Sequence, residues 1–253
     1  MNTNSNGYTL TFTAILVLVV SVLLAFTAVS LKPAQKENMR KEKMQNILAS
    51  VGIEVSAQDA QGTFDKQLVD QIILDANGVA KESKKTAFEV DVLKEYKSGL
   101  NSIYSKNSSD KVARTKALIK KGANYPLFIL KDKEGKENYI IPVVGNGLWG
   151  PIWGYVALSS DKNTVSGATF DHKTETPGLG AEITEPFFQD PWVGKKVFGD
   201  NGEFKSIKVV KGGADDFDLH GVDAISGGTI TSNGVSEMVE RTLSIYESYL
   251  TSK

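Results

Sequence analysis

Two glycine-rich segments in the C-terminal half of the chain carry residue types that could hold a phosphorylated ligand. The first occupies residues 175–180 and reads ETPGLG. Pro177 pushes the residue before it into an extended conformation, and Gly178 can adopt the positive φ of a type II turn. Such a turn exposes backbone N–H groups and lets a ligand approach closely, although an ordinary tight turn has the same pattern.

The second segment, DAISGGTITSNGV at residues 223–235, leads directly into an amphipathic helical pattern. A helix start offers unpaired N–H groups and a partial positive charge, both of which suit a phosphate. The glycine spacing matches neither a Walker loop nor a dinucleotide fingerprint, so it does not support ATP or NAD binding. On local physics alone, a helix capped by Ser232 or Asn233 with a flexible lead-in is the simpler interpretation.

A third segment, GNGLWGPIWG at residues 145–154, places two indole rings among glycines. Trp149 falls in an expected turn, where a large ring usually covers something. The ring could equally belong to the core, and the segment by itself does not decide between the two.

Taken in order, the three segments closely resemble an FMN-binding family. This family contains the C subunits of the sodium-translocating NADH:quinone oxidoreductases and the G subunits of the Rnf electron-transport complexes. The resemblance extends from about Tyr139 to the C-terminus, and the family also has a single N-terminal membrane anchor. GNGLWGPIWG and the TSNGV sequence favour the quinone-reductase type, with the Rnf type as the alternative. A membrane-anchored module that holds its ligand non-covalently is a second alternative.

The resemblance implies covalent FMN. The family signature, D-x-x-S/T-G-A-T, carries FMN through a phosphoester on its final threonine. In this chain the signature aspartate is Asp223, the acceptor is Thr229, and Gly228 replaces the family's alanine. The replacement removes a methyl group but leaves the hydroxyl, so we expect flavinylation at Thr229.

A second match to the signature core, SGAT at residues 166–169, has Asn163 in place of the aspartate. The match lies in an expected strand, and no helix start follows that could receive the phosphate. We therefore prefer Thr229 over Thr169 as the acceptor.

The resemblance also suggests a role for each site residue. No base is evident beside Thr229, so a separate flavin transferase would make the ester with FAD as donor. Asp223 would serve that modification through recognition or metal-assisted positioning, and Ser226 with nearby N–H groups would hold the phosphate. Leu148, Trp149 and Leu179 would contact the ring, and Glu175 and Thr176 would contact its polar edge. The predicted cofactor-binding residues are Leu148, Trp149, Glu175, Thr176, Gly178, Leu179, Asp223, Ser226, Gly227, Gly228 and Thr229.

Composition narrows the chemistry. The 253 residues include no cysteine and two histidines, which argues against disulfides, Fe–S clusters, thiolate zinc sites and a His-rich metal site. The 29 basic and 30 acidic side chains argue against a general nucleic-acid binder. Neither histidine lies in a recognisable nucleophile setting, and we expect no catalytic residue or metal ligand. Redox chemistry would come from the flavin as an electron relay, with NADH and quinone sites on other subunits.

Residues 10–31 carry no charge and can span the roughly 30 Å hydrocarbon core of a membrane as a helix. A cleaved signal peptide is the rival interpretation, but the leader before this stretch contains no Lys or Arg. Basic residues follow the stretch, which by the positive-inside rule would keep the rest of the chain in the cytoplasm. The resemblance instead implies a periplasmic flavin domain on the inner membrane, and we adopt that expectation.

The remaining patterns predict an α+β fold, in which an antiparallel sheet has helices packed on one face. We expect strands at residues 127–130, 139–144, 152–158, 164–170 and 204–210. Helices are expected after Pro33, within residues 187–197 and over the last amphipathic stretch. The expected division is a tail at residues 1–9, an anchor at 10–31, a membrane-proximal α+β region at 32–125 and an FMN-binding domain at 126–253.

Overall fold

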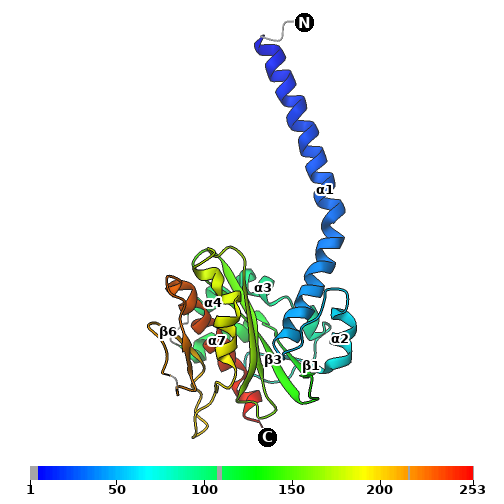
Figure 1. The fold of residues 1–253 in the computed structure, drawn as a ribbon. Coiled ribbons are helices and arrows are strands. Elements are labelled where there is room, and N and C mark those ends of the chain that lie inside the picture. Colours follow the sequence, from blue (N-terminus) through cyan, green and yellow to red (C-terminus); the bar gives the residue numbers. More distant parts are fainter. Residues whose placement is uncertain (1–4, 107–109, 216, 253) are drawn as a thin grey trace. The chain divides into compact units, whose positions relative to one another are not determined.

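The computed structural model describes residues 5–106, 110–215 and 217–252. The chain divides into two compact units, Met1–Lys43 and Met44–Lys253 (Figure 1). No boundary between compact units falls at residue 125, so the proposed FMN-binding domain is part of a larger folded unit.

The first unit is helical. Helix α1 (Asn6–Ala49) is 44 residues long, and its apolar part is long and hydrophobic enough to cross a bilayer. The helix continues through Pro33, so the helix that we expected after this residue is the same helix as the apolar stretch. A proline removes one backbone donor and bends a helix, but it does not have to end one. The polar Thr27 is tolerated within the apolar part because its hydroxyl donates to the Leu23 carbonyl at 2.8 Å.

The second unit contains a five-stranded antiparallel sheet in the order β1-β2-β3-β4-β5. The strands are β1 (Leu68–Leu74), β2 (Tyr125–Lys131), β3 (Glu137–Asn146), β4 (Pro151–Leu158) and β5 (Val165–His172). The predicted α+β class and antiparallel sheet are confirmed. The first strand comes from the region that we expected to be membrane-proximal, where Leu74 pairs with Tyr125 of β2.

A small parallel pair, β6 (Lys208–Val210) and β7 (Gly221–Asp223), lies outside this sheet. The strand expected at residues 204–210 is therefore shorter than predicted. Ser206 takes a positive φ of 63°, which interrupts the extended backbone, and Phe204 makes only an isolated bridge to Phe198.

Short helical segments connect the strands, and one long helix ends the chain. They are α2 (Ala60–Gln67), η1 (Ala87–Glu89), α3 (Val92–Glu95), η2 (Tyr96–Leu100), α4 (Asn101–Lys106), α5 (Lys111–Lys121), η3 (Gly180–Thr184), α6 (Pro186–Gln189), η4 (Asp190–Trp192) and α7 (Thr229–Leu250). The short helix expected within residues 187–197 corresponds to α6 and η4.

Helices cover both faces of the sheet, rather than the single face that we expected. Ile141 of β3 belongs to the core cluster that contains α7, whereas its neighbour Ile140 belongs to a cluster with Met44 of α1 and Phe64 of α2. This alternation follows from the strand, because successive side chains point to opposite faces. The second layer also includes Ile47 and Leu48, near the C-terminal end of α1.

Helix α7 lies close along β3 (Figure 1) because glycines remove side chains from the contact. A Cβ atom on Gly145 would lie 2.7 Å from Cβ of Met238, and one on Gly234 would collide with the carbonyl oxygen of Asn146. Both collisions would push the helix off the strand. The glycines therefore fix the start of α7 beside the end of β3.

Candidate functional site

One buried carboxylate connects the three segments that the sequence singled out. Glu175 is 5% exposed, and its Oε1 accepts the backbone N–H of Trp149 at 2.8 Å. Its Oε2 accepts the hydroxyl of Thr231 at 2.6 Å and the N–H of Leu148 at 3.3 Å. A single side chain thus holds the 147–150 loop to the first turn of α7.

These hydrogen bonds keep Glu175 ionised. Burial opposes the charged form, but the bonds from Thr231 and from the backbone of residues 148–150 outweigh it and hold the pKa of this carboxyl below its usual range. The backbone N–H of Glu175 donates to Nδ1 of His172 at 3.2 Å, which orients the segment as it leaves β5.

Glycines leave room for this carboxylate. A Cβ atom on Gly147 would lie 2.6 Å from Oε1 of Glu175. A Cβ on Gly180 would collide with Oε2 of Glu175 and with the Thr231 hydroxyl. The glycines of the two loops therefore have a specific use, which is to let backbone approach the Glu175 side chain.

The side chains around Glu175 that we expected to contact a ring are solvent-exposed. Leu148 is 49% exposed, Trp149 is 65% exposed and Leu179 is 41% exposed. Trp149 is therefore not a core residue, which removes the alternative left open by its sequence. These exposed apolar side chains are available to contact a planar ligand.

Helix α7 begins at Thr229, and among the described residues no side-chain hydrogen bond caps its start. Gly228 is the N-cap residue, and Thr229 is half-buried. The expected cap by Ser232 or Asn233 is wrong, because both residues lie inside the helix. Ser232 instead accepts the N–H of Ile225 at 3.1 Å, which ties the preceding loop to the first turn. The N–H groups at the helix start thus remain without a side-chain cap, as an anion site requires.

The two glycine-rich segments lie against each other at this helix start. Gly227 has a φ of 76°, and a Cβ atom on it would lie 2.6 Å from Cδ2 of Leu179. A Cβ on Gly228 would lie 3.0 Å from Cγ2 of Ile225, which is a tight contact rather than a collision. Tertiary structure thus brings Leu179 to the loop that precedes Thr229.

The ETPGLG segment forms the expected turn at Gly178, but the N–H group of Gly178 is not free to bind a ligand. Gly178 takes the positive φ of 76° that we predicted. Its N–H donates to Oε1 of Glu182 at 2.8 Å, so it serves the turn itself. Thr176 accepts the N–H of Leu179 at 3.1 Å through its carbonyl, and its side chain is exposed.

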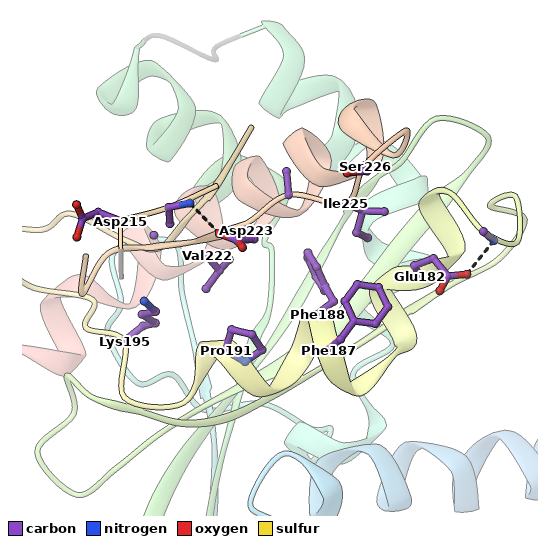
Figure 2. A pocket seen from close by; sticks show the side chains of 14 residues that line it. Glu182, Phe187, Phe188, Pro191, Lys195, Asp215, Val222, Asp223, Ile225 and Ser226 are labelled. Carbon is purple, nitrogen blue, oxygen red and sulfur yellow. Dashed lines mark hydrogen bonds between the residues drawn. The ribbon is translucent and has the colours of Figure 1, made fainter. Parts of the chain in front are cut away.

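A cavity of about 600 Å³ opens beside this helix start (Figure 2). Three of the predicted residues line it, namely Gly178, Asp223 and Ser226. The cavity also has an aromatic wall that we did not predict, where Phe187 and Phe188 of α6 lie across from Val222 and Ile225 (Figure 2). The unusual EPFFQDPW run at residues 185–192 could have indicated this wall, since Phe187 is 61% exposed.

Asp223 lies at the rim of the cavity and already has a structural partner. Its Oδ1 accepts the N–H of Ala214 at 2.7 Å, as Figure 2 shows. Within the described residues there is no group of three or more potential metal ligands. A metal ion at Asp223 would therefore need its other ligands from a partner or a substrate.

The second SGAT sequence lies in β5. Thr169 pairs with Tyr155 of β4, and its hydroxyl donates to the carbonyl of Asn46 at 3.3 Å. This hydroxyl lies at no helix start, in keeping with the preference for Thr229.

Residues 147–244 match the FMN-binding domain family. The chain thus belongs to the class of proteins with an FMN-binding domain, and its described residues include one candidate membrane span.

Full-length relatives narrow this class. The chain is 36% identical over 222 residues to the C subunit of the Na(+)-translocating NADH-quinone reductase of Vibrio parahaemolyticus, covering 86% of this chain and 83% of that protein. The Yersinia pestis protein of the same name is 35% identical and covers 92% of this chain and 87% of its own length. The chain belongs to the family of C subunits of the Na(+)-translocating NADH-quinone reductases.

Solved structures show the same relationship. The crystal structure of the C subunit from Parabacteroides distasonis is 39% identical with a TM-score of 0.72, and the match covers 88% of this chain and 98% of that chain. The Shewanella oneidensis NqrC structure is 26% identical with a TM-score of 0.64, covering 85% and 98%.

Proposed function

We propose that this chain is an electron-relay subunit of a sodium-translocating NADH:quinone reductase and carries FMN as a phosphoester on Thr229. The observation that carries the proposal is the placement of Thr229. Its hydroxyl belongs to the first residue of an uncapped helix, inside the stretch that matches an FMN-binding domain.

The residues present suit FMN. The uncapped N–H groups at the start of α7 and the exposed Ser226 hydroxyl would hold the phosphate, whose charge is favoured at a helix N-terminus. Leu148, Trp149 and Leu179 would cover the ring with exposed apolar surface. When bound, FMN supplies the electron-transfer chemistry, and this chain positions it.

Of the two polar residues expected at the edge of the flavin ring, only one has a side chain that is free to bind the ligand. Thr176 is exposed and could contact a ligand directly. Both oxygens of Glu175 are engaged by groups of this chain, so Glu175 would act beneath the ring rather than as a free hydrogen-bond acceptor.

Attachment would be a phosphoryl transfer from FAD. In that transfer the Thr229 oxygen would bond to the flavin-side phosphorus, the bond from that phosphorus to the bridging oxygen would break, and AMP would leave. A flavin transferase would accept the proton of the Thr229 hydroxyl. Asp223 would be recognised by that enzyme across the open cavity.

The remaining subunits would supply the NADH and quinone sites and exchange electrons with the tethered flavin. The apolar part of α1 would anchor the chain among lipids, and residues 126–253 would form the flavin-carrying part on the periplasmic side of the inner membrane. A protease added to intact spheroplasts would then cleave the flavin-carrying part. Protection of this part until the membrane is lysed would contradict that orientation.

Covalent attachment is tested with the full-length chain co-expressed with a flavin transferase. Thr229→Val should abolish flavin fluorescence of the denatured gel band, and intact mass should show the bare polypeptide. Thr169→Val should keep both the fluorescence and the added mass. A fluorescent band in Thr229→Val would show that the flavin is attached to another residue. Unmodified wild-type protein that still binds FMN would support a non-covalent binding module.

A further inference from the structure

We infer that the buried Glu175 carboxylate lowers the reduction potential of the attached flavin, in addition to joining the loops of its site. This inference rests on the proposed attachment at Thr229. It assigns a tuning role to a residue whose polar atoms all face this chain.

The position of Glu175 relative to the attachment point is fixed by covalent and hydrogen-bonded links. Its Oε2 accepts the hydroxyl of Thr231, which is two residues after Thr229 in the same helical turn. Its Oε1 accepts the N–H of Trp149, whose exposed ring belongs to the proposed apolar surface for the flavin. A flavin on Thr229 that lies over this surface would have the carboxylate beneath it.

The charge of Glu175 is stabilised only by dipoles. Hydroxyl and backbone N–H groups hold the carboxylate in its ionised form, and none of the ion pairs found in the described residues includes it. With the side chain 5% exposed, water screens its charge poorly. A full negative charge therefore acts on the surroundings of the helix start.

The site is shaped to keep this carboxylate in place. Gly147 and Gly180 lie so close to its two oxygens that a methyl group at either position would displace it. The electrostatic consequence is that reduction, which adds negative charge to a flavin ring, becomes less favourable above Glu175.

The hydrogen bond from Thr231 gives this inference a signature that a purely structural role lacks. Glu175→Gln removes the negative charge and should raise the potential of the flavin. Thr231→Val removes a donor that partly offsets this charge and should lower the potential. Two variants that merely loosen the same contact would instead shift the potential in the same direction.

The experiment is a potentiometric titration of the full-length chain with flavin attached, in wild type, Glu175→Gln and Thr231→Val. Glu185→Gln is the control. It removes an exposed carboxylate at the start of α6 and should leave the reduction potential of the flavin unchanged. Flavin content is measured first by absorbance and intact mass, so that absence of flavin on wild-type Thr229 counts against the proposed function alone. With flavin present, an unchanged potential in Glu175→Gln, or shifts of one sign in both variants, overturns the inference. If Glu175→Gln does not fold, Thr231→Val tests the inference by itself. An unchanged or raised flavin potential in Thr231→Val would overturn the inference.

Discussion

The Thr231 hydroxyl donates to the Glu175 carboxylate at 2.6 Å across 56 residues of sequence. The same carboxylate accepts the N–H of Trp149 from a third segment. Glu175 therefore joins the loop that carries Trp149 to the helix turn that begins with Thr229.

Removing the Thr231 hydroxyl should destabilise the fold. Thr231→Val leaves a buried carboxylate without one of its donors, which should lower the free energy of unfolding by about 1–3 kcal/mol. Urea denaturation of the full-length protein in detergent measures the change. Thr251→Val removes an exposed hydroxyl at the other end of α7, where it donates to the Glu247 carbonyl, and should change stability by less than about 0.5 kcal/mol. Equal effects of the two variants would show that the Glu175 contact contributes nothing specific.

A methyl group at Gly180 should disrupt the same contact by collision. In Gly180→Ala the added Cβ would overlap Oε2 of Glu175 and the Thr231 hydroxyl, so we expect about 1–3 kcal/mol of destabilisation and less flavin incorporation. Gly62→Ala is the matched control, because no atom lies within 4 Å of its added Cβ and alanine is favoured in helix α2. That variant should be stabilised by about 0.5–1 kcal/mol. Thermal unfolding measures the stability of both variants, and gel fluorescence measures their flavin content. A Gly180→Ala variant as stable and as fluorescent as Gly62→Ala would contradict the expected collision.

Restoring the alanine of the family signature at position 228 should have little effect on folding or flavinylation. Gly228→Ala places its Cβ 3.0 Å from Cγ2 of Ile225, at a backbone φ of -100° that alanine adopts easily. We expect a cost of at most about 1 kcal/mol and continued flavinylation. Gly227→Ala should cost more, about 1–2 kcal/mol or above, because φ is 76° and the Cβ would meet Leu179. Intact mass after co-expression with the transferase measures modification, and loss of flavin in Gly228→Ala alone would contradict this order.

Stability should depend on pH through Glu175. The folded-state pKa of this carboxyl lies below its usual value, so the unfolded chain binds the proton more tightly. Its contribution to stability is complete above the ordinary glutamate pKa of about 4.3 and is lost as the pH falls through the lower folded pKa. The difference in unfolding free energy between wild type and Glu175→Gln should therefore shrink as the pH is lowered below that range. A difference that stays constant with pH would mean that Glu175 does not titrate with folding.

Several features of the fold could be predicted from local patterns. Alternating apolar residues predict β3 and β4, and the uncharged stretch at residues 10–31 predicts the apolar part of α1. The turn at Gly178 and the long final helix follow from single residues and from helical spacing. These predictions hold because backbone sterics and burial of one face act over a few neighbouring residues.

The start of α7 and the use of Glu175 could not be predicted in this way. Ser232 is a good capping residue by type, but its hydroxyl accepts the Ile225 N–H from inside the helix, and the N-cap is Gly228, four residues earlier. Nothing in the sequence near Glu175 shows that its partners are Trp149 and Thr231. The addition of β1 to the sheet edge is similarly a long-range pairing.

By itself, then, the sequence determined the class of fold and the apolar span, and its resemblance to an FMN-binding family made Thr229 the candidate acceptor. Only the tertiary structure decided that Thr229 opens an uncapped helix and that a buried carboxylate fixes the surface beside it. The physical reason is that turns and strands are set by neighbouring residues, whereas hydrogen-bond partners and cavities depend on segments brought together when the sheet and α7 pack.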